Sequence, residues 1–233
     1  MILYRYWHAL ALASAISAGV VHAQGPAPVA DPTAATAAPL PAEAFATLPF
    51  LQAPALSPDG TRVALRMAIK GEQRFAIIRL DGASNPVMIN PGPNDLNSWA
   101  WVNNDWLVAT IGTTAPVEGD SWYLRRTVGI SADGKKINVL GKDVAAQGAD
   151  DILWIARDGS PHIRLALQTS IYRDAAGFWP EVRDFDVTNG HSVQVQPPRD
   201  TVMDWYADGT GTVRSGLAYD DDARSYRLLY RDS

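Results

Sequence analysis

Residues 53–82, APALSPDGTRVALRMAIKGEQRFAIIRLDG, decide the fold of this chain. Residues 57–60, SPDG, predict a tight turn, because proline presets one backbone dihedral and Asp-Gly accepts a positive φ at little cost. Large apolar side chains alternate with arginine and alanine over residues 62–67, which is typical of a strand with two unlike faces. A second turn is expected at 70–73 and a further strand at 74–80. The stretch therefore predicts three consecutive strands joined by two hairpin turns.

The turn signal of this stretch recurs along the chain in two interleaved series. Members of the first series are spaced by 45, 54 and 50 residues, and members of the second by 52 and 56. An interleaved repeat of roughly 50 residues is typical of β-propeller blades, and a β-sandwich of similar length does not account for it. The first series is Asp59-Gly60, Asn104-Asp105, Asp158-Gly159 and Asp208-Gly209, and the second is Asp81-Gly82, Asp133-Gly134 and Asn189-Gly190.

The fold class predicted from this repeat is all-β, an incomplete β-propeller of about three and a half four-stranded blades. Two central strands of the second blade are expected at 106–111 and 122–131. An aromatic group before a first-series turn is expected to pack a blade against its neighbour. A large apolar residue stands at this position in each blade: Leu56, Trp101, Trp154 and Trp205. The blades are expected at about residues 52–90, 98–140, 151–196 and 202–233.

The fourth predicted blade lacks its outermost strand. Because a propeller needs four or more blades to close its ring, the open blade faces and edges would expose apolar surface and invite self-association. We therefore expect a chain that is truncated, or one that closes its ring with another copy.

Composition excludes several classes of function. The chain of 233 residues is 47% hydrophobic and 19% charged, with a formal net charge of −5 and no basic runs, so no nucleic-acid partner is expected. It contains no cysteine, which excludes disulfides, cysteine nucleophiles and thiolate metal sites.

The N-terminus resembles a secretory signal peptide over residues 1–23. Arg5 supplies a positive charge, residues 9–21 form an uncharged and mostly apolar run, and Val21-His22-Ala23 fits a cleavage site. A transmembrane anchor is the alternative, but a run of 13 residues is too short to cross about 30 Å of hydrocarbon. The mature protein is thus expected to be periplasmic or secreted, with no membrane span after cleavage.

Two short segments are expected between the signal peptide and the strands. Residues 24–41 are rich in proline and alanine, which predicts an extended or disordered linker. Residues 42–51 are expected to form a short helix and a lead-in, because Pro41 suits the start of a helix.

These features together resemble a known family. The signal peptide, the Pro/Ala-rich spacer and "LPFLQAPALSPDGTRVAL" precede the turns SPDG, SADG and RDG, "RDFDVTNG" and a final "YRLLYRDS". The chain resembles, over about residues 41–233, the N-terminal propeller of secreted bacterial members of the prolyl oligopeptidase family of serine peptidases, the acylaminoacyl- and dipeptidyl-peptidase-like branches above all. The resemblance implies a propeller that filters access to a C-terminal α/β-hydrolase domain carrying the catalytic Ser, Asp and His. SPDG hairpins also occur in TolB-like propellers.

The chain departs from that family at the catalytic residues. It contains no G-x-S-x-G, and its nearest string, residues 129–133 (GISAD), lacks the second glycine and is expected in a hairpin, whereas a nucleophile elbow needs a strand-to-helix turn. No catalytic, cofactor-binding or metal-binding residue is therefore assigned, no cofactor is expected, and the substrate-binding residues are not identified.

Several other residues have a functional and a structural interpretation. His162 and His191 could bind a metal, but neither has a partner at metal-ligand spacing. Asp220-Asp221-Asp222 could bind calcium or form a solvated hairpin turn, and Gly209-Thr210-Gly211 is interpreted as a blade turn. Arg125 or Arg126 could hold a peptide carboxylate in the central channel or pair with a neighbour. The tryptophans could form a sugar platform or pack in the core, which is the default: Trp99, Trp101, Trp106, Trp122, Trp154, Trp179 and Trp205.

Two functions remain open on this basis. The first is the substrate-gating propeller of an exported prolyl oligopeptidase-like serine peptidase, not catalytic alone, whose hydrolase domain is absent from the chain. The second is a stand-alone periplasmic TolB-like propeller that binds a protein or peptide.

Overall fold

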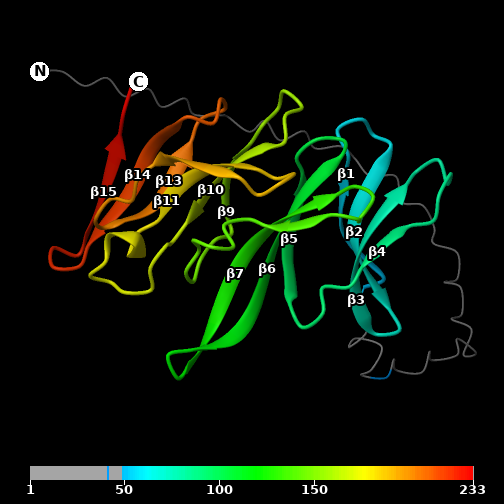
Figure 1. Cartoon of the computed structure of the whole chain (residues 1–233), viewed down its shortest axis with the longest axis horizontal. Coiled ribbons are helices and arrows are strands. Elements are labelled where there is room, and N and C mark those ends of the chain that lie inside the picture. Colours follow the sequence, from blue (N-terminus) through cyan, green and yellow to red (C-terminus); the bar gives the residue numbers. More distant parts are fainter. Residues whose placement is uncertain (1–40, 42–48, 233) are drawn as a thin grey trace, which may run out of the picture. The chain divides into compact units, whose positions relative to one another are not determined.

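The computed structural model describes Pro41 and residues 49–232. The chain divides into two units, Met1–Ala44 and Phe45–Ser233, and the account below concerns the second. The predicted signal peptide, nearly all of the predicted linker and residues 42–48 of the predicted helix lie outside the described residues. The described part is built of fifteen strands and one short 3-10 helix (Figure 1).

The strands form four antiparallel sheets, and in each sheet neighbouring strands follow one another in sequence. Sheet 1 consists of β1 (Leu51–Leu56), β2 (Arg62–Ile69), β3 (Glu72–Arg79) and β4 (Val87–Ile89). Sheet 2 consists of β5 (Asp95–Trp101), β6 (Trp106–Val117), β7 (Asp120–Ser131) and β8 (Ile137–Val139). Sheet 3 consists of β9 (Asp151–Ile155), β10 (His162–Leu167), β11 (Glu181–Asp186) and β12 (Ser192–Gln196), with the helix η1 (Ala176–Phe178) between β10 and β11. Sheet 4 consists of β13 (Val202–Ala207), β14 (Val213–Asp220) and β15 (Ser225–Tyr230).

Side chains that alternate along the strands of sheets 2 and 3 point to opposite faces, and each face packs in a different core. In β6, Leu107 and Ala109 belong to a core shared with sheet 1, whereas Val108 belongs to a core shared with sheet 3. In β10, Leu165 likewise packs in the core with sheet 2 and Ala166 in the core with sheet 4. Each buried core therefore joins two consecutive sheets, which is how successive blades of a propeller pack.

This arrangement confirms the predicted fold class. The described residues form all-β sheets of three or four antiparallel strands, arranged as part of a β-propeller. Sheet 4 has three strands among the described residues, and β15 forms its edge, as the sequence predicts.

The structure corrects the sequence prediction at two hairpins. The turn expected at 70–73 consists of Lys70 and Gly71 alone, because Ile69 already pairs with Glu72. The hairpin of sheet 2 is much longer than expected, since β6 continues past Ile111 to Val117 and pairs with β7 throughout (Figure 1). Its two-residue turn, Glu118 and Gly119, has φ values of 51° and 92° at these two residues, so glycine suits the second position.

One glycine of β7 is explained by close packing between sheets. A Cβ at Gly129 would lie 2.5 Å from the carbonyl oxygen of Val187, which follows β11 in sheet 3. Asn138 of the neighbouring strand β8 also contacts this oxygen, since its Nδ2 donates a hydrogen bond to Val187 O at 3.0 Å. Gly129 thus allows a close approach of sheets 2 and 3 that a larger residue would block.

Candidate functional site

The first-series turns of all four sheets line one pocket of about 750 Å³. We call it the mouth pocket, because it lies where the first strand of each sheet ends, and the first strands of propeller blades face the central channel. Its lining includes Pro58 of sheet 1, Trp101 and Asn103 of sheet 2, Trp154 of sheet 3 and Asp208 of sheet 4. The sequence predicts these four turns as a repeat but does not predict that they share a pocket.

Hydrogen bonds connect the four turns in order. Each bond joins the turn region of one sheet to that of the next, and a side chain supplies one of the two atoms. The bonds run from Asp59 N to Asn104 Oδ1 (3.0 Å), from Asn103 Nδ2 to Gly159 O (3.0 Å) and from Trp154 Nε1 to Gly209 O (3.1 Å). A hydrogen bond at the edge of the mouth pocket therefore connects each pair of consecutive sheets.

The aspartate carboxylates of these turns accept hydrogen bonds from residues of the same turn or next to it. The Asp59 carboxylate accepts hydrogen bonds from Ser57 Oγ at 2.6 Å and from the Thr61 backbone at 3.0 Å, and these bonds lower its pKa to about 2. Asp208 accepts bonds from Thr210 and from Arg214 Nε, which hold its pKa well below the usual range. These carboxylates stay ionised at neutral pH and hold the turns, so they are poor candidates for general acids.

The three aromatic residues expected to pack blade against blade do so. The Trp101 indole donates to Ala55 O of sheet 1 at 2.9 Å, and the Trp205 indole donates to Pro180 O beside sheet 3 at 2.7 Å. Trp154 instead contacts the following sheet, since it stands four residues before its turn rather than three and side chains alternate along a strand. Leu56, the aliphatic residue at the same position of sheet 1, is 59% exposed, because no sheet precedes sheet 1 within residues 49–232.

The seven tryptophans considered as a sugar platform are side chains of the interior and its margins. Trp101 and Trp205 are buried, and the other five are partly buried. Trp99 contacts Phe75 edge to face, with 5.4 Å between ring centroids. Core packing, the default interpretation, is confirmed for the four tryptophans that belong to or pack against a core, Trp99, Trp101, Trp106 and Trp205.

Ser131, the serine of the string nearest to G-x-S-x-G, caps a hairpin turn. Its Oγ donates to Asp133 Oδ1 at 2.7 Å and accepts from the Lys136 backbone at 3.0 Å, and the residue is 8% exposed. The carboxylate beside it is a poor general base, because the hydrogen bonds from Ser131 and from the Lys135 backbone lower the pKa of Asp133 to about 2.

His162 has a carboxylate partner that the sequence analysis missed. Its Nδ1 lies 2.5 Å from Asp184 Oδ1 on the neighbouring strand, and the same carboxylate forms an ion pair with Arg164. Residues 162 and 184 are two positions from a direct cross-strand pair, so strand register was the missing information. Residues 49–232 contain no group of three side chains suited to a metal ion, and His191 lies exposed beside a turn.

The two arginines of β7, Arg125 and Arg126, bind groups of the loop between β8 and β9. The Arg126 guanidinium donates to three backbone carbonyls of the loop between β8 and β9, those of Ala145, Ala146 and Gln147, and desolvation lowers its pKa. Arg125 Nε lies 3.4 Å from Asp150 Oδ1. Pairing with neighbours, the structural interpretation, is therefore confirmed for both.

The two remaining motifs are hairpin turns. The Asp220 carboxylate accepts the backbone N–H groups of Asp222 and Ala223 at 3.1 and 3.0 Å, and Asp221 forms an ion pair with Arg173. Residues 209–211 belong to the turn that Asp208 caps, as expected.

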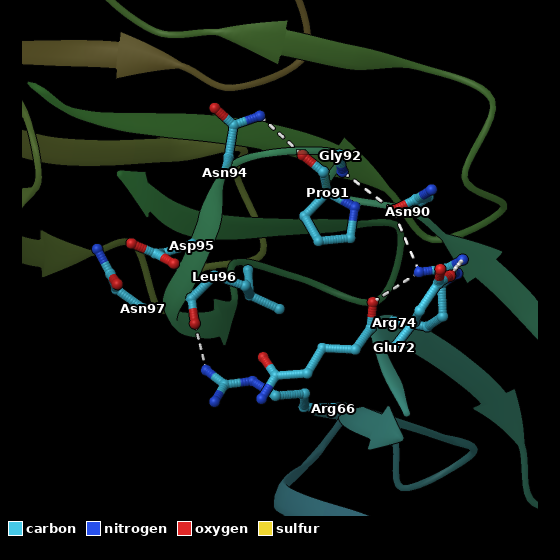
Figure 2. A pocket seen from close by; sticks show the side chains of 11 residues that line it. Arg66, Glu72, Arg74, Asn90, Pro91, Gly92, Asn94, Asp95, Leu96 and Asn97 are labelled. Atoms are coloured by element: carbon cyan, nitrogen blue, oxygen red, sulfur yellow. Dashed lines mark hydrogen bonds and ion pairs between the residues drawn. The ribbon is translucent and has the colours of Figure 1, made fainter. Parts of the chain in front are cut away.

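A second pocket, which we call the side pocket, lies between sheets 1 and 2 and has a volume of about 770 Å³ (Figure 2). The end of β2, the start of β3, the β4–β5 connection and the start of β5 line it. Its lining carries two arginines, two carboxylates and four carboxamides: Arg66, Arg74, Glu72, Asp95, Gln73, Asn90, Asn94 and Asn97. No sequence motif points to this set, because tertiary packing alone brings the two sheets together here.

A search of the described residues for a helix long and apolar enough to cross a membrane finds none.

No protein-family model and no curated protein matches the chain. Among solved structures, the chain is similar to an acylaminoacyl peptidase in complex with Z-Gly-Gly-Phe-chloromethyl ketone, at 13% identity and a TM-score of 0.46, over 80% of this chain and 31% of that one. It is similar to TolB from Acinetobacter baumannii at 11% identity and a TM-score of 0.37, over 78% and 44% of the two chains. It is also similar to the tricorn protease at 9% identity and a TM-score of 0.28, over 77% and 25%.

All three of these proteins contain β-propellers, and the chain spans less than half the length of each. The assignment of a partial propeller rests on the sheet order and the three cores described above rather than on these similarities.

Proposed function

We propose that this chain is the substrate-gating propeller of an exported serine peptidase that resembles the prolyl oligopeptidase family. In this proposal the propeller admits peptides to a hydrolase domain and carries no catalytic residue of its own. The observation that carries the proposal is the mouth pocket, a single opening built jointly by all four sheets.

The chemistry of the mouth pocket suits an unfolded polypeptide. Asn103, Asn104 and Arg157 bring polar groups to it, and Trp101, Leu153 and Ile155 bring apolar surface. A volume of about 750 Å³ lies within the range of ligand pockets, roughly 300–1,000 Å³. Such a lining can contact peptide groups and side chains without selecting one sequence.

The absence of a nucleophile elbow supports a gating role. The sequence contains no G-x-S-x-G, and Ser131 of the nearest string is held in a hairpin turn. Hydrolysis would therefore depend on a separate domain. The signal-peptide pattern of residues 1–23 supports export, to the periplasm or beyond the cell.

The coding sequence that follows Ser233 provides the first test. We expect it to encode further blades and then an α/β-hydrolase domain with G-x-S-x-G. An unrelated coding sequence would contradict the peptidase proposal and favour the alternative, a stand-alone periplasmic propeller that binds a protein or peptide as TolB-like modules do.

The gating role is tested in the protein that includes this following sequence. Asn103→Ala removes the bond between the turns of sheets 2 and 3, so the mouth should loosen. We expect hydrolysis of a dipeptide chromogenic substrate to stay unchanged, while cleavage of a 30-residue polypeptide rises several-fold. Asn189→Ala, in an outer turn of sheet 3, is the matched control. Equal effects of N103A on both substrates, or on neither, would contradict gating at this pocket.

A further inference from the structure

The mouth pocket carries one positive charge that has no counter-ion in the described part of the chain. Two charged side chains, Arg157 and Asp208, belong to its lining. Asp208 is neutralised by Arg214, whose Nε lies 2.8 Å from the carboxylate. Arg157 is exposed, lies in the turn between β9 and β10, and forms no ion pair with any residue from 49 to 232. The charge that the lining offers to a ligand is therefore positive.

The hydrogen bonds that connect the turns engage acceptors of the mouth pocket and leave donors available. Asn104 Oδ1 accepts the Asp59 N–H at 3.0 Å, and the carbonyl of Gly159 accepts a hydrogen bond from Asn103 Nδ2 at 3.0 Å. Asn104 Nδ2 has no acceptor in the part of the chain that the structure describes, although an amide nitrogen carries two donors. The N–H groups of Asn104 and of the Arg157 guanidinium thus remain available to a ligand.

Arg157 and Asn104 lie in turns that are bonded to each other. Asn103, which precedes Asn104, donates to Gly159, two residues after Arg157. Both Arg157 and Asn104 are exposed, and both line the mouth pocket. The carboxylate beside Arg157, that of Asp158, accepts a backbone N–H of its own turn at 2.9 Å and does not belong to the lining. A guanidinium and a carboxamide donor therefore meet at one side of the pocket.

We propose that the mouth pocket prefers peptides that bring a carboxylate to it, and that this carboxylate accepts hydrogen bonds from the Arg157 guanidinium and from Asn104 Nδ2. An ionised carboxylate only accepts hydrogen bonds, so it fits a place where donors are available, and a guanidinium can bind both of its oxygens. The carboxylate belongs either to an Asp or Glu side chain or to the C-terminus of the peptide. This inference rests on the proposed function, since it names the class of peptide that the same pocket admits.

The test is isothermal titration of the full chain with pentapeptides of equal length. The neutral reference is acetyl-AAQAA-amide, acetyl-AAEAA-amide adds a side-chain carboxylate, acetyl-AAQAA with a free C-terminus adds a terminal carboxylate, and acetyl-AAKAA-amide adds a cation. At least one carboxylate peptide should bind roughly tenfold more tightly than the neutral reference, because it gains charge-assisted hydrogen bonds. The lysine peptide should bind no more tightly than the reference. The carboxylate peptide that binds more tightly identifies the source of the carboxylate.

Variants locate the preference at these two side chains. Arg157→Gln should reduce the affinity for the preferred carboxylate peptide to that for the neutral reference. Asn104→Asp keeps an oxygen for the Asp59 N–H but replaces the donor by an anionic oxygen, so it should also abolish the preference. Arg224→Gln removes an exposed arginine at the other end of β14, between β14 and β15, and is the matched control. Because Arg157 and Asn104 are exposed, both variants should keep the circular dichroism spectrum of the parent.

Three results would overturn this inference: equal affinity for all four peptides, no binding of either carboxylate peptide at millimolar concentration, or a carboxylate preference that survives in R157Q. None of them decides the gating role, because the comparison of substrates with N103A depends on the size of the substrate rather than on its charge. Conversely, equal effects of N103A on both substrates would contradict gating and leave a measured carboxylate preference in place. The two proposals therefore fail separately.

Discussion

At the scale of single residues, the interfaces between sheets depend on tryptophans that combine burial with one directed hydrogen bond. Trp205 is 5% exposed, packs in the core between sheets 3 and 4, and donates to Pro180 O. An indole supplies a large apolar area and a single donor, which suits a boundary where one carbonyl remains to be satisfied.

Replacing this indole should loosen the boundary between sheets 3 and 4. We expect Trp205→Ala to lower the free energy of unfolding by about 3–5 kcal/mol, and Trp205→Phe, which loses mainly the hydrogen bond, by about 1–2 kcal/mol. Urea unfolding followed by circular dichroism measures both. Val193→Thr, at a residue that is 69% exposed, is the control and should change the value by less than about 0.5 kcal/mol. A W205A protein as stable as the control would contradict the role given to Trp205.

The turn aspartates predict how stability depends on pH. Hydrogen bonds from side chains and backbone lower the pKa of Asp59, Asp81 and Asp133 to about 2, below the value of about 3.9 in an unfolded chain. The folded state therefore binds these protons more weakly. Their contribution to stability is complete above about pH 4 and is lost as the pH falls toward 2.

The contribution of Asp151 to stability changes with pH in the opposite direction. Desolvation, with the nearby carboxylates of Asp204 and Asp150, raises its pKa to about 6, so its ionised form costs stability at pH 7. That cost is relieved as the pH falls through 6, although the effect is small because Asp151 is exposed. We expect the melting temperature to rise slightly from pH 7 to 5 and to fall from pH 4 to 2, by a modest amount because the turn carboxylates are solvent-exposed. A melting temperature that is unchanged down to pH 2 would contradict the turn-capping role.

At the scale of elements, the hairpin of β6 and β7 shows where a local signal was missed. Twelve residue pairs extend from Trp106–Ser131 to Val117–Asp120, so the turn must contain two residues. Glu118 occupies the left-handed region at φ 51°, which glutamate adopts less readily than asparagine. Asn-Gly and Asp-Gly predict such turns strongly, whereas Glu-Gly is a weaker signal.

This turn can be improved or weakened by single substitutions. Glu118→Asn should raise the free energy of unfolding by up to about 1 kcal/mol, because asparagine adopts the left-handed region more readily. Gly119→Ala should lower it by about 1–2 kcal/mol, since Gly119 has a φ of 92°. Thermal unfolding of the two variants and the parent gives the comparison. The same sign of change in both variants would contradict the turn geometry.

The strands were largely predictable because they follow a period of two between strong turn signals. The strand predicted at 106–111 begins with β6, at Trp106, and the strand predicted at 122–131 ends with β7, at Ser131. The contents of the side pocket were not predictable, because Arg66 and Asp95 come from different sheets and no spacing along the chain relates them. The carboxylate partner of His162 was missed for a similar reason, since strand register decides which residues meet.

At the scale of the whole described part, two sheet faces are apolar and have no covering sheet. On sheet 4, Tyr226, Leu228 and Tyr230 alternate along β15 and are 68%, 71% and 68% exposed. On sheet 1, Leu56 and Met88 are 59% and 40% exposed. These faces correspond to the faces that elsewhere pack one sheet on the next, so contact with a further sheet is expected to bury them.

The exposed faces predict self-association of the chain on its own. We expect an apparent mass that rises with protein concentration in sedimentation velocity, and a lower apparent mass in the double variant Tyr226→Lys, Leu228→Lys. Its melting temperature should remain near that of the parent, because neither side chain belongs to a core. Val193→Lys, at a residue that is 69% exposed on sheet 3, is the control. A parent chain that stays monomeric at all concentrations would contradict this expectation.

The central claim is that consecutive sheets are blades whose first turns meet around one channel. Because the chain has no cysteine, introduced cysteine pairs can be linked specifically. A short bismaleimide should join Asn103→Cys of sheet 2 to Ser160→Cys of sheet 3, since Asn103 donates to the adjacent Gly159. It should not join Asn103→Cys to Asp174→Cys, which lies in the loop at the opposite end of sheet 3. Mass spectrometry detects the link, and failure of the first pair to react, or equal reaction of both pairs, would contradict the radial arrangement.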